Sequence, residues 1–393
     1  MMDCFSVSSA ASRRRFAFLS DKQKIMSTQL RESYSQMQRI QKKQVNVVKR
    51  MVLVGAGHAH LECIKQGSHP EIDWIVVTPS RYQYYSGMFS GLADGTYTLD
   101  ETRIDVKALC ERHGKTWIED RVMRIDAAGK QVICQSGRVV PYDIVSCNIG
   151  SSDWEASTPI HVTIKPNYRV EDAFQTFRSA DSPVIVGSGA AAVEMAASFQ
   201  SNGTPVTLIH EEPLLSGHPA GPELTARLDQ LGVIRIVDRF ETLDGQTAHL
   251  RSGHSIETDA VLFLGGASAT ELFRASDLYC DARGFLLVHE TLQSLEDPSI
   301  FAVGDCATLT AYPETPKNGV TAVRQAPLLF QNLIRFVNDE PLRTFRPQRY
   351  YLTLLALGHR QATLLYGRFY RTNRLSWYFK QWIDRRFIKK YTV

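Results

Sequence analysis

Short apolar runs that end in glycine-rich turns give this chain its clearest pattern. Met51–Val54 contains four apolar residues and leads directly into the turn Gly55–Gly57. Val184–Val186 leads into the turn Gly187–Gly189 in the same way. A short apolar run bounded by glycine predicts a strand buried in a parallel sheet, followed by a turn into a helix.

The two units repeat each other beyond the turn. Each contains a further predicted strand, a Glu seven residues after the first glycine, and a later strand that opens with Asp and ends with Gly. The matching segments are Ile75–Val77 and Val206–Ile209, Glu62 and Glu194, and residues 142–150 and 258–266. Two copies in tandem predict an α/β protein with two Rossmann-like dinucleotide-binding domains.

Both turns have the geometry needed to hold a diphosphate. The first glycine permits the tight turn, the second lets the backbone approach the pyrophosphate, and the helix N-terminus offers free N–H groups and partial positive charge. In the second copy Ala192 supplies the small third residue. Glu211 stands there in the place of the acid that holds the ribose hydroxyls, which favours NADH over NADPH.

The first copy departs from this pattern at two positions. His60 replaces the small third residue, so we expect the helix to lie slightly off the strand, and Thr78 stands where the acid would be. Both His58 and His60 are expected to pack or hydrogen-bond locally rather than bind a metal, because no other ligand spacing supports a metal site.

The charge is distributed unevenly along the chain. Its formal net charge is +4, with 11 Lys or Arg against 3 Asp or Glu in residues 1–50, and 9 against 1 in residues 359–393. The acidic middle argues against a nucleic-acid enzyme, whose basic surface should lie on the folded domain. Residues 1–49 are interpreted either as an organelle-targeting presequence or as a disordered basic extension.

Other site classes are weakly supported. No apolar run approaches the ~20 residues of a membrane-spanning helix. The seven cysteines form no CxxC or CxxxxC pair, so neither a disulfide framework nor a zinc site is expected. Cys147 and Cys306 lie at predicted strand ends and leave sulfide oxidation as a minor alternative to simple core packing.

Residues 372–393 combine aromatic and basic positions. The apolar positions are Leu375, Trp377, Tyr378, Phe379, Trp382, Ile383, Phe387, Ile388 and Tyr391, and Lys380, Arg385, Arg386, Lys389 and Lys390 lie between them. An apolar stripe with a cationic face is typical of a helix that lies on an anionic membrane surface. The alternative is a terminal helix that packs on its own body or forms a homodimer face.

Six motifs spread along the chain point to a known family. They are Gly55–His60, Tyr85–Met88, Gly304–Ala307, Pro316–Val320, Ala322–Gln325 and Trp382–Phe387. With them, the chain from about residue 50 onward resembles the flavoproteins with two dinucleotide-binding domains, which include type II NADH dehydrogenases, sulfide:quinone oxidoreductases and apoptosis-inducing-factor-like proteins. It is most similar to the NADH-dehydrogenase-like module often fused to selenide, water dikinase. The CxxxxC pair of the glutathione-reductase branch is absent.

The resemblance implies roles for individual residues. FAD would contact Gly55, Gly57, His58, Ala59, Thr78, Tyr85, Ser86, Gly87, Gly150, Gly304, Asp305, Asn318, Gly319 and Val320. NADH would contact Gly187, Gly189, Ala192 and Glu211. Catalytic roles would fall to Glu194 near the nicotinamide and to Lys317 and Gln325, although Lys317 has the alternative of a solvated loop cation or a surface ion pair. A helix from Gly319 would direct its N-terminus at the flavin's carbonyl edge and stabilise negative charge there.

The resemblance also divides the chain into segments. We predict a first part of the FAD-binding domain at 50–165, an NAD(P)H-binding domain at 166–285, a second part of the FAD-binding domain at 286–345, and a membrane-contact or dimer segment at 346–393.

The function predicted is that of an FAD-dependent NAD(P)H dehydrogenase with a quinone-like acceptor, at the periphery of a membrane in a mitochondrion or plastid. The alternatives are an FAD- and NADH-binding redox sensor or scaffold of apoptosis-inducing-factor type, a reductase of a soluble sulfur or selenium acceptor, and a location in the cytoplasm.

Overall fold

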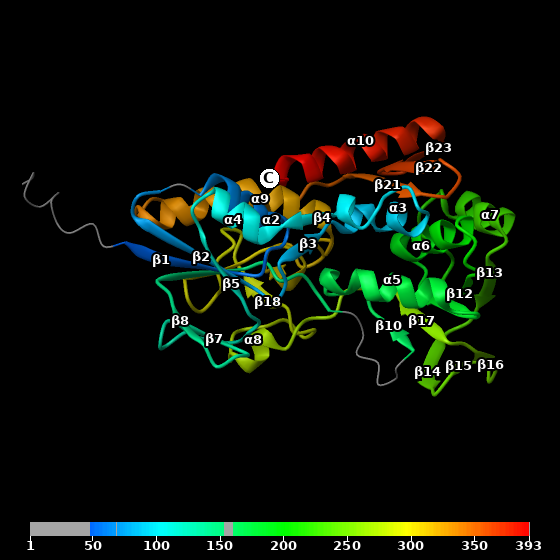
Figure 1. Ribbon diagram of the computed structural model, residues 1–393, viewed down its shortest axis with the longest axis horizontal. Coiled ribbons are helices and arrows are strands. Elements are labelled where there is room, and N and C mark those ends of the chain that lie inside the picture. The colour runs from blue at the N-terminus through cyan, green and yellow to red at the C-terminus, as the bar shows by residue number, and fades with distance from the viewer. Residues whose placement is uncertain (1–47, 68, 153–159, 393) are drawn as a thin grey trace, which may run out of the picture. The chain divides into compact units, whose positions relative to one another are not determined.

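The computed structural model describes residues 48–67, 69–152 and 160–392. The predicted extension at 1–49 therefore lies outside the described residues, except for its last two. The described chain is built around two five-stranded parallel sheets, which confirms the α/β class (Figure 1).

The first sheet has the strand order β19-β9-β1-β2-β5. Its strands are β19 (Ile300–Ala302), β9 (Ile144–Cys147), β1 (Lys49–Val54), β2 (Ile72–Thr78) and β5 (Thr116–Glu119). Its helices are α2 (His58–Gln66), α4 (Val106–Arg112) and α9 (Gly319–Val337). The helix α8 (Leu272–Ala275) packs on β6 (Val122–Asp126), and α3 (Phe89–Ala93) packs on α6 (Ala190–Ser201) of the second unit. Met51 to Val54 are all buried, because helices cover both faces of a parallel sheet.

The second sheet repeats the first, with the strand order β10-β17-β11-β12-β13. Its strands are β10 (His161–Val162), β17 (Ala260–Phe263), β11 (Pro183–Val186), β12 (Thr207–His210) and β13 (Ile234–Val237). The helices α5 (Val170–Ser179), α6 (Ala190–Ser201) and α7 (Gly221–Leu231) accompany it. The strands predicted beside each glycine turn are thus present in both copies.

Smaller elements complete the two units. They are the pair β3 (Tyr82–Tyr84) and β4 (Arg103–Asp105); β6 (Val122–Asp126), β7 (Gln131–Cys134) and β8 (Val139–Pro141); β14 (Phe240–Asp244), β15 (Thr247–Leu250) and β16 (Ser255–Glu257); the pair β18 (Leu286–Val288) and β20 (Ala307–Leu309); and the 3-10 helices η1 (Ser86–Met88), η2 (Asp100–Thr102), η3 (Asn167–Arg169) and η4 (Gly304–Cys306).

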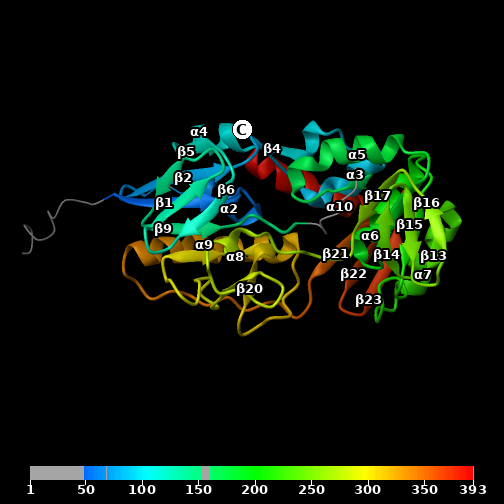
Figure 2. The same cartoon turned by 90° about the horizontal axis from the view of Figure 1, so that it is seen from below.

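The first unit is discontinuous in sequence. After the second sheet is complete, the chain returns to add β19 to the edge of the first sheet, and α9 packs against α2 (Figure 2). A three-stranded antiparallel sheet then follows, which the sequence did not predict, with β21 (Leu352–Ala356), β22 (Ala362–Tyr366) and β23 (Phe369–Asn373). It leads into α10 (Arg374–Tyr391), which runs from this sheet toward α2 (Figure 1).

Candidate functional site

The first glycine turn joins β1 to α2 at the carboxyl end of the first sheet. Gly55 has a φ of +81°, and a Cβ there would lie 2.7 Å from the carbonyl oxygen of Asn148. A Cβ on Gly57 would lie 2.4 Å from Oδ1 of the same asparagine. Both positions therefore require glycine, and the residue that imposes this requirement is Asn148, at the end of β9.

Asn148 organises the first turn of α2, a role that the sequence did not predict. Its Oδ1 accepts hydrogen bonds from the backbone N–H groups of Ala59 (2.9 Å) and His60 (3.3 Å), and its Nδ2 donates to the carbonyl of Val303 (3.0 Å). None of these bonds uses the N–H of His58. Asn148 thus joins β9, α2 and the approach to η4 through one buried side chain.

His60 fills the space behind this turn. The ring is fully buried, with Nδ1 2.6 Å from the carbonyl oxygen of Gly55 and Nε2 2.9 Å from Oγ of Ser146. The expectation that this histidine bonds locally is confirmed. Burial lowers the pKa of His60 to about 4, so the imidazole is neutral near pH 7.

His58 is the polar group in this region that points to a ligand. It is buried between Tyr85 and Phe387, with ring centroids 5.5 and 5.3 Å away, and its Nε2 has no hydrogen-bond partner among the described residues. The same ring edge faces Gly319, the first residue of α9, where a Cβ would lie 3.7 Å from Nε2. Burial lowers the pKa of His58 to about 4.

The N-termini of α2 and α9 therefore converge on one orphaned imidazole nitrogen. Two helix N-termini form a favourable environment for a negatively charged group, and a buried polar atom without a partner calls for one. FAD fits this arrangement, because it brings both a diphosphate and carbonyl oxygens that accept hydrogen bonds. Asn318 caps α9 by accepting the N–H of Thr321 (3.0 Å), which confirms the predicted start of that helix.

Other predicted residues form a group around η4. Asp305 lies 4.0 Å from Nζ of Lys165, and burial raises the pKa of its carboxyl. Gln325 is buried and accepts the backbone N–H of Gly304 at 2.7 Å. Gln325 therefore supports the segment that carries Asp305.

Lys317 is held by its own neighbours. Its ammonium donates to the carbonyl of Ala307 (2.7 Å) and to Oγ1 of Thr308 (3.1 Å), and it lies 3.7 Å from the centroid of the Phe285 ring. Burial lowers its pKa to about 8. A solvated loop cation would have none of these contacts, so that alternative for Lys317 is wrong.

The remaining predicted cofactor positions lie at strand and helix ends. Thr78 is buried at the end of β2, Gly150 follows β9, Ser86 and Gly87 lie in η1, and Val320 is the partly exposed second residue of α9.

The second glycine turn is more open than the first. Gly187 has a φ of +148°, and a Cβ there would lie 2.7 Å from the carbonyl oxygen of Leu264. This is the same distance as that from a Cβ on Gly55 to the carbonyl oxygen of Asn148. A Cβ on Gly189, the N-cap of α6, would meet nothing within 4 Å. Ala192 is fully buried behind the turn. The N-terminus of α6 therefore has room for a diphosphate.

Glu211 follows β12, where a ribose-binding acid was predicted. It is half exposed and lies 3.9 Å from Nε of Arg239 and 3.7 Å from an Nη atom of Arg251. These two arginines were not predicted, because they come from later turns of the same unit.

Glu194 belongs to a buried charge cluster. Its carboxylate accepts the backbone N–H of Ala356 (2.9 Å) and lies 3.6 Å from Nζ of Lys380 on α10. Lys380 also lies 3.3 Å from Asp384 and donates to the carbonyl of Gly87. Burial raises the pKa of Asp384 to about 6.

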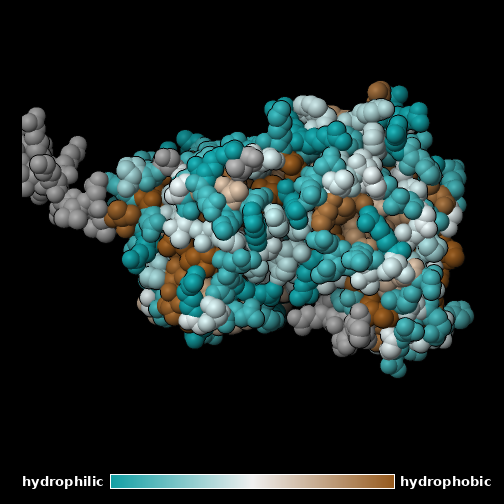
Figure 3. Space-filling view, viewed as in Figure 1, coloured by the Kyte–Doolittle hydropathy of each residue, from teal (hydrophilic) through white to brown (hydrophobic). Residues whose placement is uncertain are grey.

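The prediction that Lys380 belongs to a cationic outer face is therefore wrong. α10 buries Lys380 and Asp384 and exposes Leu375, Tyr378, Phe379 and Trp382. Lys380 and Asp384 are four positions apart and stand between apolar residues. This spacing was the sequence signal that the helix buries polar side chains and exposes apolar ones. Figure 3 shows the outer surface over α10 as mostly teal and white with isolated brown groups.

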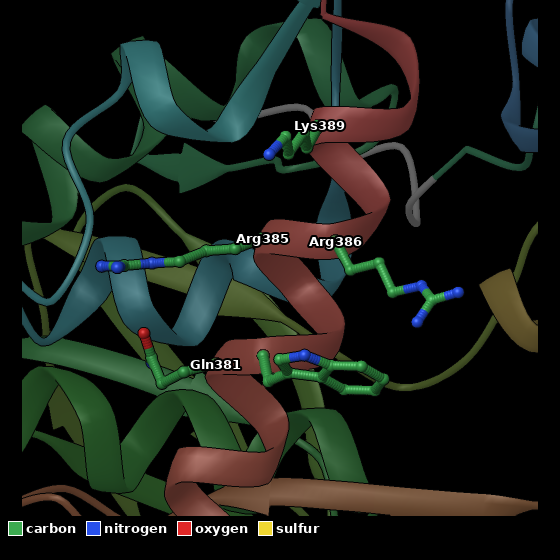
Figure 4. A pocket seen from close by; sticks show the side chains of 5 residues that line it. Gln381, Arg385, Arg386 and Lys389 are labelled. Carbon is green, nitrogen blue, oxygen red and sulfur yellow. The ribbon is translucent and has the colours of Figure 1, made fainter.

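A shallow hollow of about 550 Å³ lies along the outer side of α10. Gln381, Trp382, Arg385, Arg386 and Lys389 line it. Arg385 and Lys389 project to one side of the helix and Arg386 to the other, so the cations do not converge on one point (Figure 4). Within the described residues, no helix is both long and apolar enough to cross a bilayer.

Comparison with known proteins agrees with this geometry. The sequence profile of the pyridine nucleotide-disulphide oxidoreductases matches residues 31–326. The chain is 26% identical to the nitric oxide reductase FlRd-NAD(+) reductase of Pectobacterium atrosepticum, over 67% of this chain and 73% of the relative. It is 24% identical to the NADH dehydrogenase-like protein YutJ of Bacillus subtilis, over 77% and 87%.

A solved structure shows the same fold. NDH2 from Plasmodium falciparum, determined in complex with NADH, superposes with a TM-score of 0.75 and 12% identity, covering 87% of this chain and 97% of that one.

Proposed function

The chain belongs to the pyridine nucleotide-disulphide oxidoreductase family, and we propose that it is an FAD-dependent NADH dehydrogenase that passes electrons to a quinone-like acceptor. Membership makes it a flavin-dependent NAD(P)H oxidoreductase with FAD and NAD(P)H as cofactors. When bound, FAD would supply the redox chemistry between the nicotinamide and the acceptor, while the protein would supply orientation and electrostatics.

The residues of the first site act by binding and orienting the flavin. The neutral imidazole of His58 offers Nε2 for one hydrogen bond at the meeting point of α2 and α9. The N-terminus of α9 stabilises negative charge at the same place. In the second site, the open end of α6 at Gly189 receives the diphosphate of NADH, and Glu211 binds the ribose.

One observation carries the choice of a quinone as the acceptor: α10 contacts the flavin site and also exposes several apolar and aromatic side chains among the polar ones on its outer side. Its Phe387 stacks on Tyr85, with centroids 4.2 Å apart, and lies beside His58. Its opposite side exposes Leu375, at 77%, and Trp382, at 54%. A lipid-soluble acceptor that meets this side of α10 would lie beside a helix that also borders the flavin site.

The same face supports attachment to a membrane surface. The exposed aromatic side chains bury in the interfacial region of a bilayer, while Arg385 and Arg386 meet anionic headgroups. We propose that the protein binds the membrane peripherally through residues 372–393.

Turnover with different acceptors tests the proposed function. The FAD-loaded protein is mixed with NADH in the presence of a short-chain soluble quinone, of a soluble sulfur or selenium acceptor, or of oxygen alone. We expect the quinone to accelerate NADH oxidation at least tenfold over oxygen. No acceleration by any acceptor would favour a redox sensor, and acceleration by the sulfur or selenium compound alone would replace the quinone.

Vesicle sedimentation tests the membrane contact. The double variant Leu375→Ser, Trp382→Ser changes only exposed side chains of α10, so FAD binding should persist while affinity for vesicles with anionic phospholipid falls about tenfold. The matched control is Tyr366→Ser, Phe369→Ser, which removes exposed aromatic residues of the β22–β23 hairpin. Equal losses in the two double variants would refute a specific role for α10.

A further inference from the structure

The helix α10 contacts each glycine-turn helix through a buried acidic residue. On α6 the contact is that of Lys380 with Glu194 (3.6 Å). The ammonium is almost completely buried, with 7% of the side chain exposed. Burial alone would lower the pKa of Lys380, but Glu194 and Asp384 together raise it, so the lysine keeps its charge.

At its other end, α10 makes the corresponding contact with α2. Lys390 lies 2.5 Å from Oε2 of Glu62, and the hydroxyl of Tyr391 donates to the same oxygen at 2.7 Å. Lys65 of α2 donates in return to the carbonyl of Lys390 (3.0 Å). Burial alone would raise the pKa of Glu62, but the hydrogen bonds from Lys390 and Tyr391 lower it below its usual value.

Glu62 and Glu194 are equivalent residues of the internal repeat. Each stands seven residues after the first glycine of its turn, and each is the fifth residue of its helix. Their side chains are almost buried, with 6% and 19% exposed. Removing either lysine leaves a poorly solvated carboxylate, although the side chain of Lys390 is itself 45% exposed.

We propose that α10 is a coupling helix, in which Lys380 and Lys390 tie the NAD-site helix α6 to the FAD-site helix α2, so that occupation of one nucleotide site changes the affinity of the other. The proposal uses the assignment of FAD to the first turn and NADH to the second, but it does not depend on the final electron acceptor.

The path that would couple the two nucleotide sites runs through α2, α10 and α6 and is short. A diphosphate at the N-terminus of α2 or α6 interacts with the first turn of that helix, and the clamped glutamate lies one turn further along. A shift of either helix moves its glutamate against a lysine of α10, which cannot follow without disturbing the other lysine. Coupling of this kind is reciprocal between the two ligands.

Binding measurements on the full-length protein test the coupling. The affinity for FAD is measured by flavin fluorescence with and without saturating NAD⁺, which occupies the second site without reducing the flavin. For the unaltered protein we expect the two FAD affinities to differ by about fivefold or more, the lower end of typical coupling.

The variants Lys390→Met and Lys389→Met separate coupling from general charge effects. Lys390→Met breaks the clamp on Glu62 and should bring the ratio of the two FAD affinities to within about twofold of one, while NAD⁺ binding to the FAD-free protein stays unchanged. Lys389→Met removes a neighbouring lysine without an ion-pair partner among the described residues and should keep the original ratio.

A second variant tests the same contact if Lys390→Met fails to fold. Tyr391→Phe removes one hydrogen bond to Glu62 and keeps Lys390, so it should reduce the ratio in part. A ratio of one in the unaltered protein, or an unchanged ratio in both Lys390→Met and Tyr391→Phe, overturns the coupling role. Neither result bears on quinone reduction, whose failure appears only in the turnover experiment.

Discussion

The two glycine turns share a backbone but differ in the side chains behind it. In both, the first glycine approaches the carbonyl of the residue that follows the neighbouring strand, Asn148 in one copy and Leu264 in the other. Behind the first turn lie His60, Ser146 and Asn148, joined by hydrogen bonds. Behind the second, the equivalent residues are Ala192, Leu262 and Leu264.

Under the proposed assignment of FAD to the first turn and NADH to the second, this difference adapts one backbone motif to two kinds of ligand. The polar group behind the first turn fixes the start of α2 before a ligand arrives, which suits a cofactor that stays bound. The second turn has an apolar interior and an open N-terminus at Gly189, which suits a nucleotide that enters and leaves in each cycle. Exchanging side chains between the copies tests this contrast.

The largest effect is expected from Ala192→His, which places the first copy's bulky residue in the second. Overpacking costs about 1–3 kcal/mol and an unsatisfied imidazole costs about as much again. The free energy of unfolding should therefore fall by about 2–6 kcal/mol. Urea-induced unfolding measures it. The reverse change, His60→Ala, leaves the Ser146 hydroxyl without its partner and should cost about 2–4 kcal/mol. Wild-type stability in Ala192→His would show that the two interiors are interchangeable.

Acid should weaken the first copy more than the second. The pKa of His58 and of His60 is lowered from 6.5 to about 4 by burial. Their contribution to stability is therefore complete above pH 6.5 and is lost as the pH falls through 4, at up to about 3 kcal/mol for each ring. The unfolding free energy of the FAD-free protein between pH 7 and 4 should fall less steeply in His58→Phe. Identical slopes would contradict the prediction.

A smaller loss of stability is expected from Asn148→Leu. This variant places in the first copy the residue type that the second copy has at the equivalent position, Leu264. It removes the acceptor for two N–H groups of α2 and the donor to Val303, and should cost about 1–3 kcal/mol. Leu264→Asn is the reciprocal control, and it should cost less because that position is only partly buried. Thermal unfolding of both variants checks the order.

The smallest effect concerns the choice of nucleotide in the second copy. Glu211→Ala removes the carboxylate that lies near Arg239 and Arg251 and would repel a 2′-phosphate. Because all three groups are exposed, the ratio of kcat/KM for NADPH to that for NADH should rise only about three- to tenfold. The double variant Arg239→Gln, Arg251→Gln should not show this rise.

Local patterns made much of the fold predictable. The strands beside each turn follow from residues close together in sequence, and the repeat of the turn pairs Glu62 with Glu194. The start of α9 at Gly319 came instead from the resemblance to a known family. The β21–β23 sheet was not predicted, because its apolar run at 352–357 is equally compatible with other elements.

The unpredicted site residues depend on contacts between distant segments. Asn148 matters because Gly57 and Val303 approach it, and Lys380 is buried because Glu194, 186 positions earlier, neutralises it. The sequence of α10 contains Asp384 but not Glu194, so its pattern assigned Lys380 to the cationic face.

The discontinuity of the first unit has a consequence for synthesis on the ribosome. Residues 160–263 supply a whole sheet from one stretch and can fold as soon as they emerge. Residues 49–147 emerge earlier but must wait for β19 and α9, more than 150 residues later, to complete their sheet edge and cover α2. The nascent chain therefore carries an unfinished half-domain through most of translation, and flavin loading is expected to be a late, largely post-translational event.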